Sequence, residues 1–566
     1  MEPLRHKLIR VVKDAAQRAI EAGALPSVGL PEVTVEHPQN PDHGDYACNI
    51  GLRMARSAQM NPLEIARHVT EHMSDVDELG ATSVAPPGFI NMTISDAWLK
   101  QQVETVLAEG QTFGNIDKGS GRRVQVEFVS VNPTGPVHIG HARGAVLGST
   151  LANVLTAAGY QVEREYYIND AGNQMDSFYR SLYARAAQSL GLEIPMPADG
   201  YMGDYVTETA EAILAESPDR AALEALVRND ADAATRVMGQ AGLAKMLDLI
   251  RDDLAMLNVE FDVWFNEQSL FDGGQYDEAI RRLRDDGYLV EREGATWFTH
   301  TSLDDDKGSV VVRSNGAPTY FASDVAYHYD KFLRRKFDHV IDVWGADHQG
   351  HVPRMKSAVE ALGIDPQRLT ILIAQLVTLR RGDEVIRLSK RTGDIITVRE
   401  VVDEVGSDVC RFFLLSRSAD SQMDFDLELA KNESEENPVF YVQYAYARIS
   451  GLRQRAAARG FDPDLSRGDV SLLGHEAELA LVRKMLLLTE IVEMVAVSYE
   501  PHHLPHYAQE LATAFHSFYK QCDVLPDRDP NLSPELTAAR LKLVEAARIV
   551  LARTLDLMGM SAPERM

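Results

Sequence analysis

The sequence has 566 residues, more than one hydrophobic core normally holds at about 100–200 residues per domain, so we expect three or four domains. Its 45% hydrophobic and 25% charged residues are ordinary for a globular protein, and no stretch approaches the ~18 uninterrupted apolar residues of a membrane-spanning helix. The net charge of −27 weighs mildly against a nucleic-acid partner, although a local cationic stripe would suffice to bind phosphates.

The N-terminus and the cysteines favour a reducing compartment. Residues 1–24 are amphipathic and interrupted by charges, so they lack the apolar stretch of a secretory signal. The three cysteines, Cys48, Cys410 and Cys522, lie far apart and form no Cys-x-x-Cys pair, which argues against a disulfide framework or a zinc knuckle. We therefore expect a cytoplasmic protein without a structural metal.

Residues 1–115 are predicted to form a separate α+β domain. Apolar residues recur at helical spacing at Leu8, Val12, Ala15 and Ala19. The expected elements are a helix at 4–22, strands at 33–38 and 88–95, a turn and helix at 42–59, and a Gly-rich linker at 108–123.

Residues 116–425 are predicted to form an α/β domain around a Rossmann-like parallel sheet. A strand at 123–131 is followed by a helix that ends at Gly159 and by a second strand at 160–170. This β-α-β order implies parallel strands joined by a right-handed crossover. Open α/β sheets place their sites after such strands, and polar residues follow two further strands expected at 339–348 and 369–379. Residues 175–260 are expected to be a helical insertion.

Residues 426–566 are predicted to be wholly helical. Four long segments show helical periodicity, at 438–459, 477–499, 506–522 and 535–560. Such a series implies an α-helical bundle. The expected fold is therefore a Rossmann-like α/β domain with an N-terminal α+β domain and a C-terminal α-helical bundle.

The first chemical motif is His138-Ile-Gly-His141, at the turn between the strand and the helix of the β-α-β unit. A helix N-terminus at the carboxyl edge of a parallel sheet attracts anions, and the two histidines lie on one face of the first turn. Gly140 lacks a side chain, so a ligand can approach the backbone there. The alternative is a capped turn with surface histidines, and the motif taken alone favours that alternative.

The second motif is the segment 385–394, where Arg387, Ser389, Lys390 and Arg391 lie in a short loop after a strand. Three cations on a flexible loop can close over a triphosphate. Taken alone, the segment favours a solvated hairpin tip.

Together the two motifs resemble, in order and separation, the two signatures of class I aminoacyl-tRNA synthetases. His-Ile-Gly-His matches the first signature letter for letter, and Arg387-Leu-Ser-Lys-Arg391 stands where the family has Lys-Met-Ser-Lys-Ser. Further stretches resemble the arginyl-tRNA synthetase family over essentially the whole chain: HGDYACNIGLRMAR, GFINMTIS, VEFVSVNPTGPVHIGHARGAVLG, YYINDAGNQM, YFASDVAYHYDKF, WGADHQGH, NPVFYVQYAYAR and SAPERM.

The resemblance implies an AMP-forming arginine–tRNA ligase with ATP and L-arginine as substrates, tRNA(Arg) as partner, and Mg²⁺ accompanying ATP. The arginine carboxylate would attack the α-phosphate, and the 2′-hydroxyl of the terminal adenosine would then accept the arginyl group. Catalysis would rest on positioning and on stabilising phosphate charge. The resemblance also implies that tRNA must bind before arginine is activated. We expect a monomer that does not bind membranes.

For ATP, the resemblance places His138, Gly140 and His141 at the phosphates from the helix side. Lys390, with Arg387, Ser389 and Arg391 beside it, would act on the β- and γ-phosphates. Arg387 replaces the first lysine of the signature, which keeps the charge but changes the donor geometry.

A second part of the ATP site is expected at the end of the strand 339–348. The resemblance assigns Gly345, Asp347 and His348 to this loop, where glycine permits a close approach and the polar pair reaches ribose or phosphate. The alternative is an ordinary strand-end turn.

Arginine is permanently charged, and a carboxylate can bind its planar guanidinium with two hydrogen bonds. Tyr320 and Asp324 stand four residues apart on a predicted helix, so a ring and a carboxylate share one face. The resemblance assigns them to the substrate guanidinium. The alternative is that Asp324 pairs with Arg334 or Arg335.

Glu127 alternates with Val126 and Phe128, so it is expected on the opposite face of the first strand. With Ser130 and Asn132 it resembles the family's strand-end contacts to the amino acid. Ser130 and Asn132 would bind its α-amino and carboxylate ends. The alternative is that Glu127 is a solvated strand residue.

The helical C-terminal part resembles an anticodon-binding domain. Tyr441, Tyr444 and Arg448 combine aromatic rings with a cation at helical spacing, and exposed rings stack on unpaired bases. The resemblance also places the C-terminal Met566 near the anticodon. The alternative is strong, because aromatic residues at helical spacing usually belong to a core.

Three other functions are weighed against this one. Cysteinyl or methionyl synthetases commonly carry zinc-type cysteine clusters, and a leucyl-type pocket would be apolar, where Asp324 would be unfavourable. A small nucleotidylyltransferase would not need the long terminal domains. A non-catalytic RNA-binding relative would not need intact His-Ile-Gly-His and Lys390.

Overall fold

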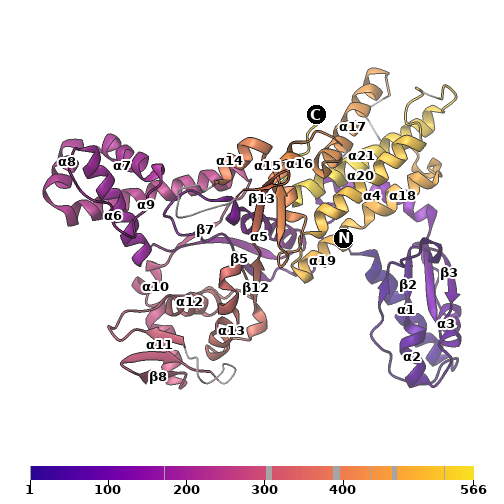
Figure 1. The fold of residues 1–566 in the computed structure, drawn as a ribbon. Helices are drawn as coiled ribbons and strands as arrows, with labels where there is room; N and C mark the ends of the chain where they lie inside the picture. Colours follow the sequence, from indigo (N-terminus) through magenta and orange to yellow (C-terminus); the bar gives the residue numbers. More distant parts are fainter. Residues whose placement is uncertain are drawn as a thin grey trace.

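The fold is described by a computed structural model that covers residues 2–170, 172–300, 309–386, 396–434, 436–461, 468–527 and 529–566. Figure 1 shows a central sheet with a helical insertion on one side and a helical bundle on the other, while the N-terminal domain lies beyond the bundle. The expected fold class is confirmed. Within the described residues no helix has the length and apolar character needed to cross a membrane.

The N-terminal domain is built on a four-stranded antiparallel sheet in the order β1-β2-β4-β3. The face of α1 that the sequence predicted is buried through Leu8, Val12, Ala15 and Ala19. The elements are α1 (Leu4–Glu21), β1 (Val35–Glu36), β2 (Tyr46–Cys48), α2 (Ile50–Ala58), α3 (Pro62–Glu71), β3 (Leu79–Ala85) and β4 (Phe89–Ile94).

The connection to the next domain is packed, not loose. Helix α4 (Asp96–Glu109) lies along the C-terminal bundle, where Lys100 Nζ donates to the Ser471 carbonyl at 3.2 Å. The Gly-rich stretch 108–123, expected to be a linker, carries Phe113, which is fully buried. Its composition is that of a linker, but the aromatic side chain anchors it in the core.

The central sheet has five parallel strands in the order β12-β11-β5-β6-β7. The chain runs outward from β5 to one edge and then returns to β11, so the switch point where open α/β sheets bind ligands lies between β5 and β11. The strands are β5 (Arg123–Glu127), β6 (Gln161–Ile168), β7 (Val263–Asn266), β11 (His339–Gly345) and β12 (Leu369–Ala374).

Strand β5 is shorter than the predicted 123–131. It ends at Glu127 because Val129 and Ser130 adopt positive φ angles of 69° and 43°, which turn the chain away from the sheet. Helix α5 (Ile139–Ala157) follows, and Gly159, with φ of 86°, closes it as expected.

Helices surround the sheet, and two small sheets extend it. The expected helical stretch 175–260 contains α6 (Asn173–Ser189), α7 (Asp204–Glu216), α8 (Arg220–Asn229) and α9 (Ala231–Met256). A lobe after β7, of which the sequence predicted only the helix that carries Tyr320 and Asp324, contains α10 (Gln268–Asp272), α11 (Gln275–Asp285), β8 (Leu289–Arg292), β9 (Ala295–Phe298), β10 (Ser309–Val312), α12 (Tyr320–Tyr329) and α13 (Val352–Ala361). The second small sheet and its helices are β13 (Val377–Arg381), β14 (Glu384–Val385), β15 (Met423–Asp426), α14 (Val398–Val405), α15 (Ser407–Leu415) and α16 (Leu427–Lys431).

The C-terminal bundle follows the predicted periodicity closely. One predicted helix, 477–499, is broken at Leu487 into two. The helices are α17 (Pro438–Ala458), α18 (Glu476–Leu486), α19 (Leu488–Ser498), α20 (His503–Gln521) and α21 (Pro534–Leu557).

One buried arginine joins the bundle to the central domain. Arg411 on α15 is fully buried, and its Nε donates to the Met558 carbonyl after α21 at 2.5 Å. Its Nη1 donates to the Leu257 carbonyl after α9 at 2.5 Å, and its Nη2 to Ser149 Oγ on α5 at 3.2 Å. Burial lowers the pKa of Arg411 to about 10. The bundle, the insertion and α5 therefore meet at one guanidinium.

Candidate active site

Three acidic side chains form a row across the central sheet. In the strand register, Glu127 of β5 lies between Asp342 of β11 and Glu165 of β6. Residues paired in this way project from the same face of the sheet. Asp342 and Glu165 are fully buried, and Glu127 is 8% exposed. Carboxylates this close together and this deeply buried need positively charged groups beside them.

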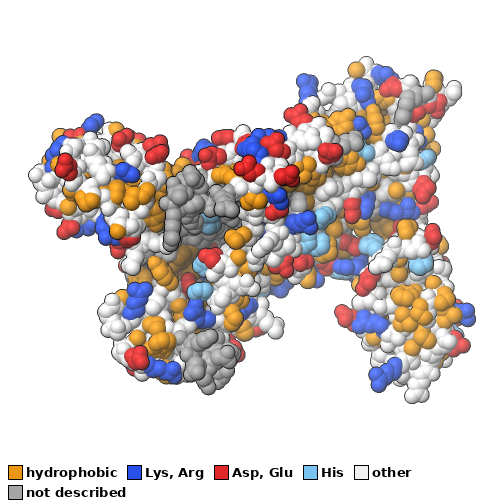
Figure 2. All heavy atoms as spheres, viewed as in Figure 1, with side chains coloured by type: hydrophobic (Ala, Val, Ile, Leu, Met, Phe, Trp, Pro, Cys, Tyr) orange, Lys and Arg blue, Asp and Glu red, His pale blue; other side chains and the backbone are white. Residues whose placement is uncertain are grey.

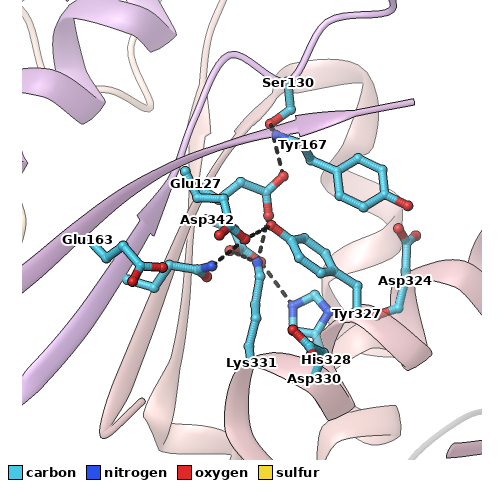
Figure 3. Close-up of polar contacts among 12 residues, drawn as sticks. Glu127, Ser130, Glu163, Tyr167, Asp324, Tyr327, His328, Asp330, Lys331 and Asp342 are labelled. Atoms are coloured by element: carbon cyan, nitrogen blue, oxygen red, sulfur yellow. Dashed lines mark hydrogen bonds and ion pairs between the residues drawn. The ribbon is translucent and has the colours of Figure 1, made fainter. Parts of the chain in front are cut away.

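Helix α12 and the wider turn that follows it supply basic side chains beside them (Figure 3). Lys331 Nζ lies 2.6 Å from Glu127 Oε2 and 2.9 Å from Asp342 Oδ1. His328 Nε2 lies 2.9 Å from Asp342 Oδ2, and Arg335 Nη1 donates to Glu165 Oε1 at 2.9 Å. Lys331 belongs to a π-helical turn, Asp330–Arg334, and is fully buried.

The two acids that share Lys331 differ in their pKa values. Burial would raise the pKa of Asp342, but Lys331 and His328 outweigh it and lower that pKa to about 2. At Glu127 burial prevails over Lys331 and raises the pKa. Asp342 is therefore the firmly ionised partner of Lys331.

Asp324 lies next to this row without a cation of its own. It is half-buried on α12, and within the described part of the chain it forms no ion pair with a lysine, arginine or histidine. The expected alternative does not hold, because Arg334 lies 3.8 Å from Glu278 and Arg335 pairs with Glu163. Burial raises the pKa of Asp324 to about 7, with Glu127 adding to the effect.

The surroundings of Asp324 are suited to a cation. Figure 3 shows the Tyr167 hydroxyl directed towards the Asp324 carboxylate. Glu267, which is 4% exposed, contributes a second negative charge, and burial raises its pKa as well. A desolvated carboxylate that lacks a partner is a strong candidate for binding a cationic ligand.

The other residues predicted to contact the amino acid have defined local contacts of their own. Ser130 Oγ donates to Glu127 Oε1 at 3.0 Å and accepts from the Tyr167 backbone N–H at 3.1 Å. Asn132 Nδ2 donates to Gln174 Oε1. Tyr320 begins α12, is 51% exposed, and places its hydroxyl over Gly172.

The His-Ile-Gly-His turn begins helix α5, as the sequence indicated. His138 is the N-cap residue, and its Nδ1 accepts the Gly140 backbone N–H at 3.1 Å. The rings of His138 and His141 lie 3.9 Å apart between centroids. A Cβ at residue 140 would lie 2.8 Å from the His138 ring, so glycine here makes room for that ring.

The loop after β11 is open to solvent. His348 Nε2 lies 3.4 Å from Asp347 Oδ2, and both side chains are exposed beyond Gly345. Ring contacts connect His348 to Trp344 and to His351 at 6.1 and 5.8 Å between centroids. The predicted phosphate-binding residues Arg387, Ser389, Lys390 and Arg391 lie outside the described residues.

The predicted tRNA-binding residues of α17 form a half-buried cluster with α20. Arg448 stacks over the rings of Tyr444 and Tyr519, 4.5 and 5.0 Å from their centroids, and its Nη1 lies 3.1 Å from His516 Nδ1. The Tyr441 hydroxyl donates to Thr513 at 3.3 Å. Met566 is 55% exposed. Figure 2 shows Lys and Arg side chains among Asp and Glu side chains on the lobes in view. The net negative charge of the whole protein therefore does not exclude local positively charged surface.

Five residues of the candidate site were not among those predicted from the sequence: Tyr167, Glu267, His328, Lys331 and Asp342. A usable signal existed for Asp342, because it interrupts the apolar strand HVIDVW. Lys331 stands in the polar run YDKFLRRK, and only the π-helical turn directs it inward.

The sheet order and the His-Ile-Gly-His turn at its switch point define a class I aminoacyl-tRNA synthetase. A family model described as "tRNA synthetases class I (R), catalytic domain" matches residues 102–423. Models for the arginyl-tRNA synthetase N-terminal domain and the DALR anticodon-binding domain match residues 6–94 and 442–566.

The chain belongs to the arginine–tRNA ligase family. The arginine–tRNA ligase of Dehalococcoides mccartyi (strain CBDB1) is 54% identical over 100% of this chain and 99% of the relative. That of Heliobacterium modesticaldum is 47% identical over 100% of both chains. The structure of Thermus thermophilus arginyl-tRNA synthetase, 21% identical, shares the fold over 99% of this chain and 100% of its own, with a TM-score of 0.75.

Proposed function

We propose that this protein activates L-arginine with ATP to arginyl-adenylate and transfers the arginyl group to the 3′-terminal adenosine of tRNA(Arg). The observation that carries the choice of amino acid is Asp324, a desolvated carboxylate beside Tyr167 that has no cationic partner in the described residues. A guanidinium supplies the missing charge and fits a carboxylate with two parallel hydrogen bonds. An apolar amino acid would leave the carboxylate unpaired.

The residues around Asp324 divide the amino acid between them. Tyr320 and Asp324 bind the guanidinium, and Ser130 and Asn132 bind the α-amino and carboxylate ends. Glu127 supports the site from the sheet, because Lys331 and Ser130 already bind both of its carboxylate oxygens. Asp324 and the nearby Glu267 keep the local potential negative, which favours a cationic substrate.

The chemistry needs no protein nucleophile. The arginine carboxylate forms a bond to the α-phosphorus while the bond to pyrophosphate breaks; the 2′-hydroxyl then attacks the carbonyl carbon and AMP leaves. His138 and His141 stabilise phosphate charge from the start of α5. Gly140, Gly345, Asp347 and His348 line the nucleotide side. Lys390, with Arg387, Ser389 and Arg391, acts on the β- and γ-phosphates.

ATP enters as its Mg²⁺ complex. No group of three or more His, Cys, Asp or Glu side chains among the described residues could form a protein cage for a metal ion. Mg²⁺ is commonly held by substrate phosphates and water with few protein ligands, and such an arrangement fits this site.

The terminal domains bind tRNA in this proposal. We assign residues 1–115 and 426–566 to tRNA contact, with Tyr441, Tyr444, Arg448 and Met566 near the anticodon, and 116–425 to catalysis. The protein acts as a monomer in the cytoplasm and needs bound tRNA to activate arginine. The shared contacts of Arg411 support a mechanical connection between the bundle and α5.

ATP–pyrophosphate exchange measured with each amino acid, with and without tRNA, tests this function. Exchange is expected with arginine alone among the amino acids, and only when tRNA(Arg) is present. Exchange with another amino acid, or none with arginine and cognate tRNA, would contradict the proposal.

The affinity for arginine is expected to depend on pH through Asp324. Its pKa is about 7, raised from 3.8 mainly by burial, and only the ionised form binds a guanidinium. The KM for arginine should therefore rise as pH falls below about 7, approaching tenfold per pH unit, and stay level above it. Steady-state exchange between about pH 5.5 and 8.5 measures this. An equal rise in the KM for ATP would show that Asp324 is not the cause.

A further inference from the structure

The His-Ile-Gly-His turn is paired with the chain that follows residues 387–395. The Ile139 backbone N–H donates to the Ile396 carbonyl at 3.1 Å, and the Val398 N–H donates to the Val137 carbonyl at 2.8 Å. His138 and Thr397 form the antiparallel bridge between them. The turn that carries both histidines and the start of α14 are therefore one small two-stranded unit.

A buried carboxylate from a third segment binds both halves of this unit. Asp253 on α9 accepts the Val137 backbone N–H through Oδ2 at 3.3 Å. Its Oδ1 accepts Arg399 Nε at 3.1 Å and Nη2 at 2.9 Å. The side chain of Asp253 is 1% exposed and that of Arg399 is 44% exposed.

These contacts hold both backbone polar groups of Val137, its N–H by Asp253 and its carbonyl by Val398. Arg399 is the second residue of α14, whose start is set by a capping box between Thr397 and Glu400. Helix α9 runs to this point from the helical insertion (Figure 1). One side chain thus sets how the start of α5 and the start of α14 stand relative to each other.

We propose that Asp253 and Arg399 form a positioning pair for the ATP step: they hold His138 and His141 in register with the chain that leaves the predicted phosphate-binding segment. This inference rests on the proposed function, because it assigns the two sides of the pair to one triphosphate. Neither Asp253 nor Arg399 contacts Asp324, Glu127 or Ser130 in any described hydrogen bond or ion pair. The effect should therefore fall on the phosphate chemistry and spare arginine binding.

Three variants test the pair in tRNA-dependent pyrophosphate exchange: Asp253→Asn, Arg399→Gln and the two combined. Asp253→Asn should lower kcat about tenfold to a hundredfold, since small misplacements at reacting groups have effects of that size. The KM for arginine should stay within about twofold. Arg399→Gln should act in the same direction, and the double variant should match the stronger single one because the residues act as a unit. Arg399→Lys, which keeps the positive charge, should retain part of the kcat that Arg399→Gln loses.

The matched control lies on the same helix. Asp248 pairs with Arg251 at 2.9 Å but is 74% exposed, so Asp248→Asn should leave kcat unchanged. A folded Asp253→Asn protein with wild-type kcat would overturn the inference, and so would equal losses in kcat, arginine binding and tRNA binding together with a lower melting temperature. If Asp253→Asn does not fold, the half-exposed Arg399→Gln decides by the same criteria. A wild-type protein without arginine-dependent exchange would instead contradict the proposed function.

Discussion

Replacing Asp324 by asparagine is expected to lower kcat/KM for arginine about 10²- to 10³-fold, the loss typical when one partner of a desolvated charge pair is removed. The asparagine keeps the shape of the side chain but cannot neutralise a guanidinium. Exchange assays at saturating ATP and tRNA measure the effect. The control Glu278→Gln changes a carboxylate on the neighbouring helix α11 that is 43% exposed, and it should retain wild-type kinetics.

In the absence of ligand, the Asp324→Asn variant should be more stable than the wild type. A carboxyl whose pKa rises from 3.8 to about 7 on folding destabilises the folded state progressively as pH increases across that interval. The gain in melting temperature for Asp324→Asn should therefore be largest above pH 7 and vanish near pH 4. An inactive Asp324→Asn protein that is less stable at every pH would indicate a damaged fold and not a lost ligand contact.

Replacing Lys331 by methionine is expected to cost about 3–5 kcal/mol of folding free energy in the central domain, because two buried carboxylates lose their cation. Lys331 Nζ contacts Glu127 and Asp342 at 2.6 and 2.9 Å and lies 4.0 Å from the centre of the Tyr327 ring. Urea unfolding followed by tryptophan fluorescence reports on this region, since Trp264, Trp297 and Trp344 all lie in it.

The loss in Lys331→Met should shrink as pH falls. Without the lysine, the pKa values of both acids rise, and protonation then removes the uncompensated charge. Arg334→Met is the control from the same turn: Arg334 is 43% exposed and lies 3.8 Å from Glu278, so its removal should cost less than about 1 kcal/mol. Equal losses in the two variants would show that the buried row of acids does not depend on Lys331.

Many of the helices and the parallel β-α-β unit were accessible from sequence because periodicity is local. Helix α1 buries the four residues that its spacing predicted, and α5 closes at Gly159 as expected. The limits of β5 were not accessible, because they depend on the positive φ angles of Val129 and Ser130, two residues that seldom adopt them. The break between α18 and α19 at Leu487 is likewise invisible in a continuous apolar pattern.

For the candidate site too, some residues could be predicted from the sequence and others could not. Motifs and resemblance singled out His138, His141 and Asp324 as candidates, because residue type and short spacing are visible in the sequence. The neutralisation of the acidic row was not accessible: Glu127, Asp342 and Glu165 come from three strands, and Lys331 reaches them through a helical irregularity. Asp253 was also hidden, because its two partners are distant in sequence and one of them is a backbone N–H.

The central claim is that the Asp324 carboxylate selects the cationic side chain of the substrate. The most direct measurement compares arginine with citrulline, its neutral isostere, in tRNA-dependent exchange by the wild type and by Asp324→Asn. We expect the wild type to favour arginine by at least about 10³-fold in kcat/KM, and the variant to lose most of that preference. An unchanged preference in a folded Asp324→Asn protein would contradict the assignment of this pocket.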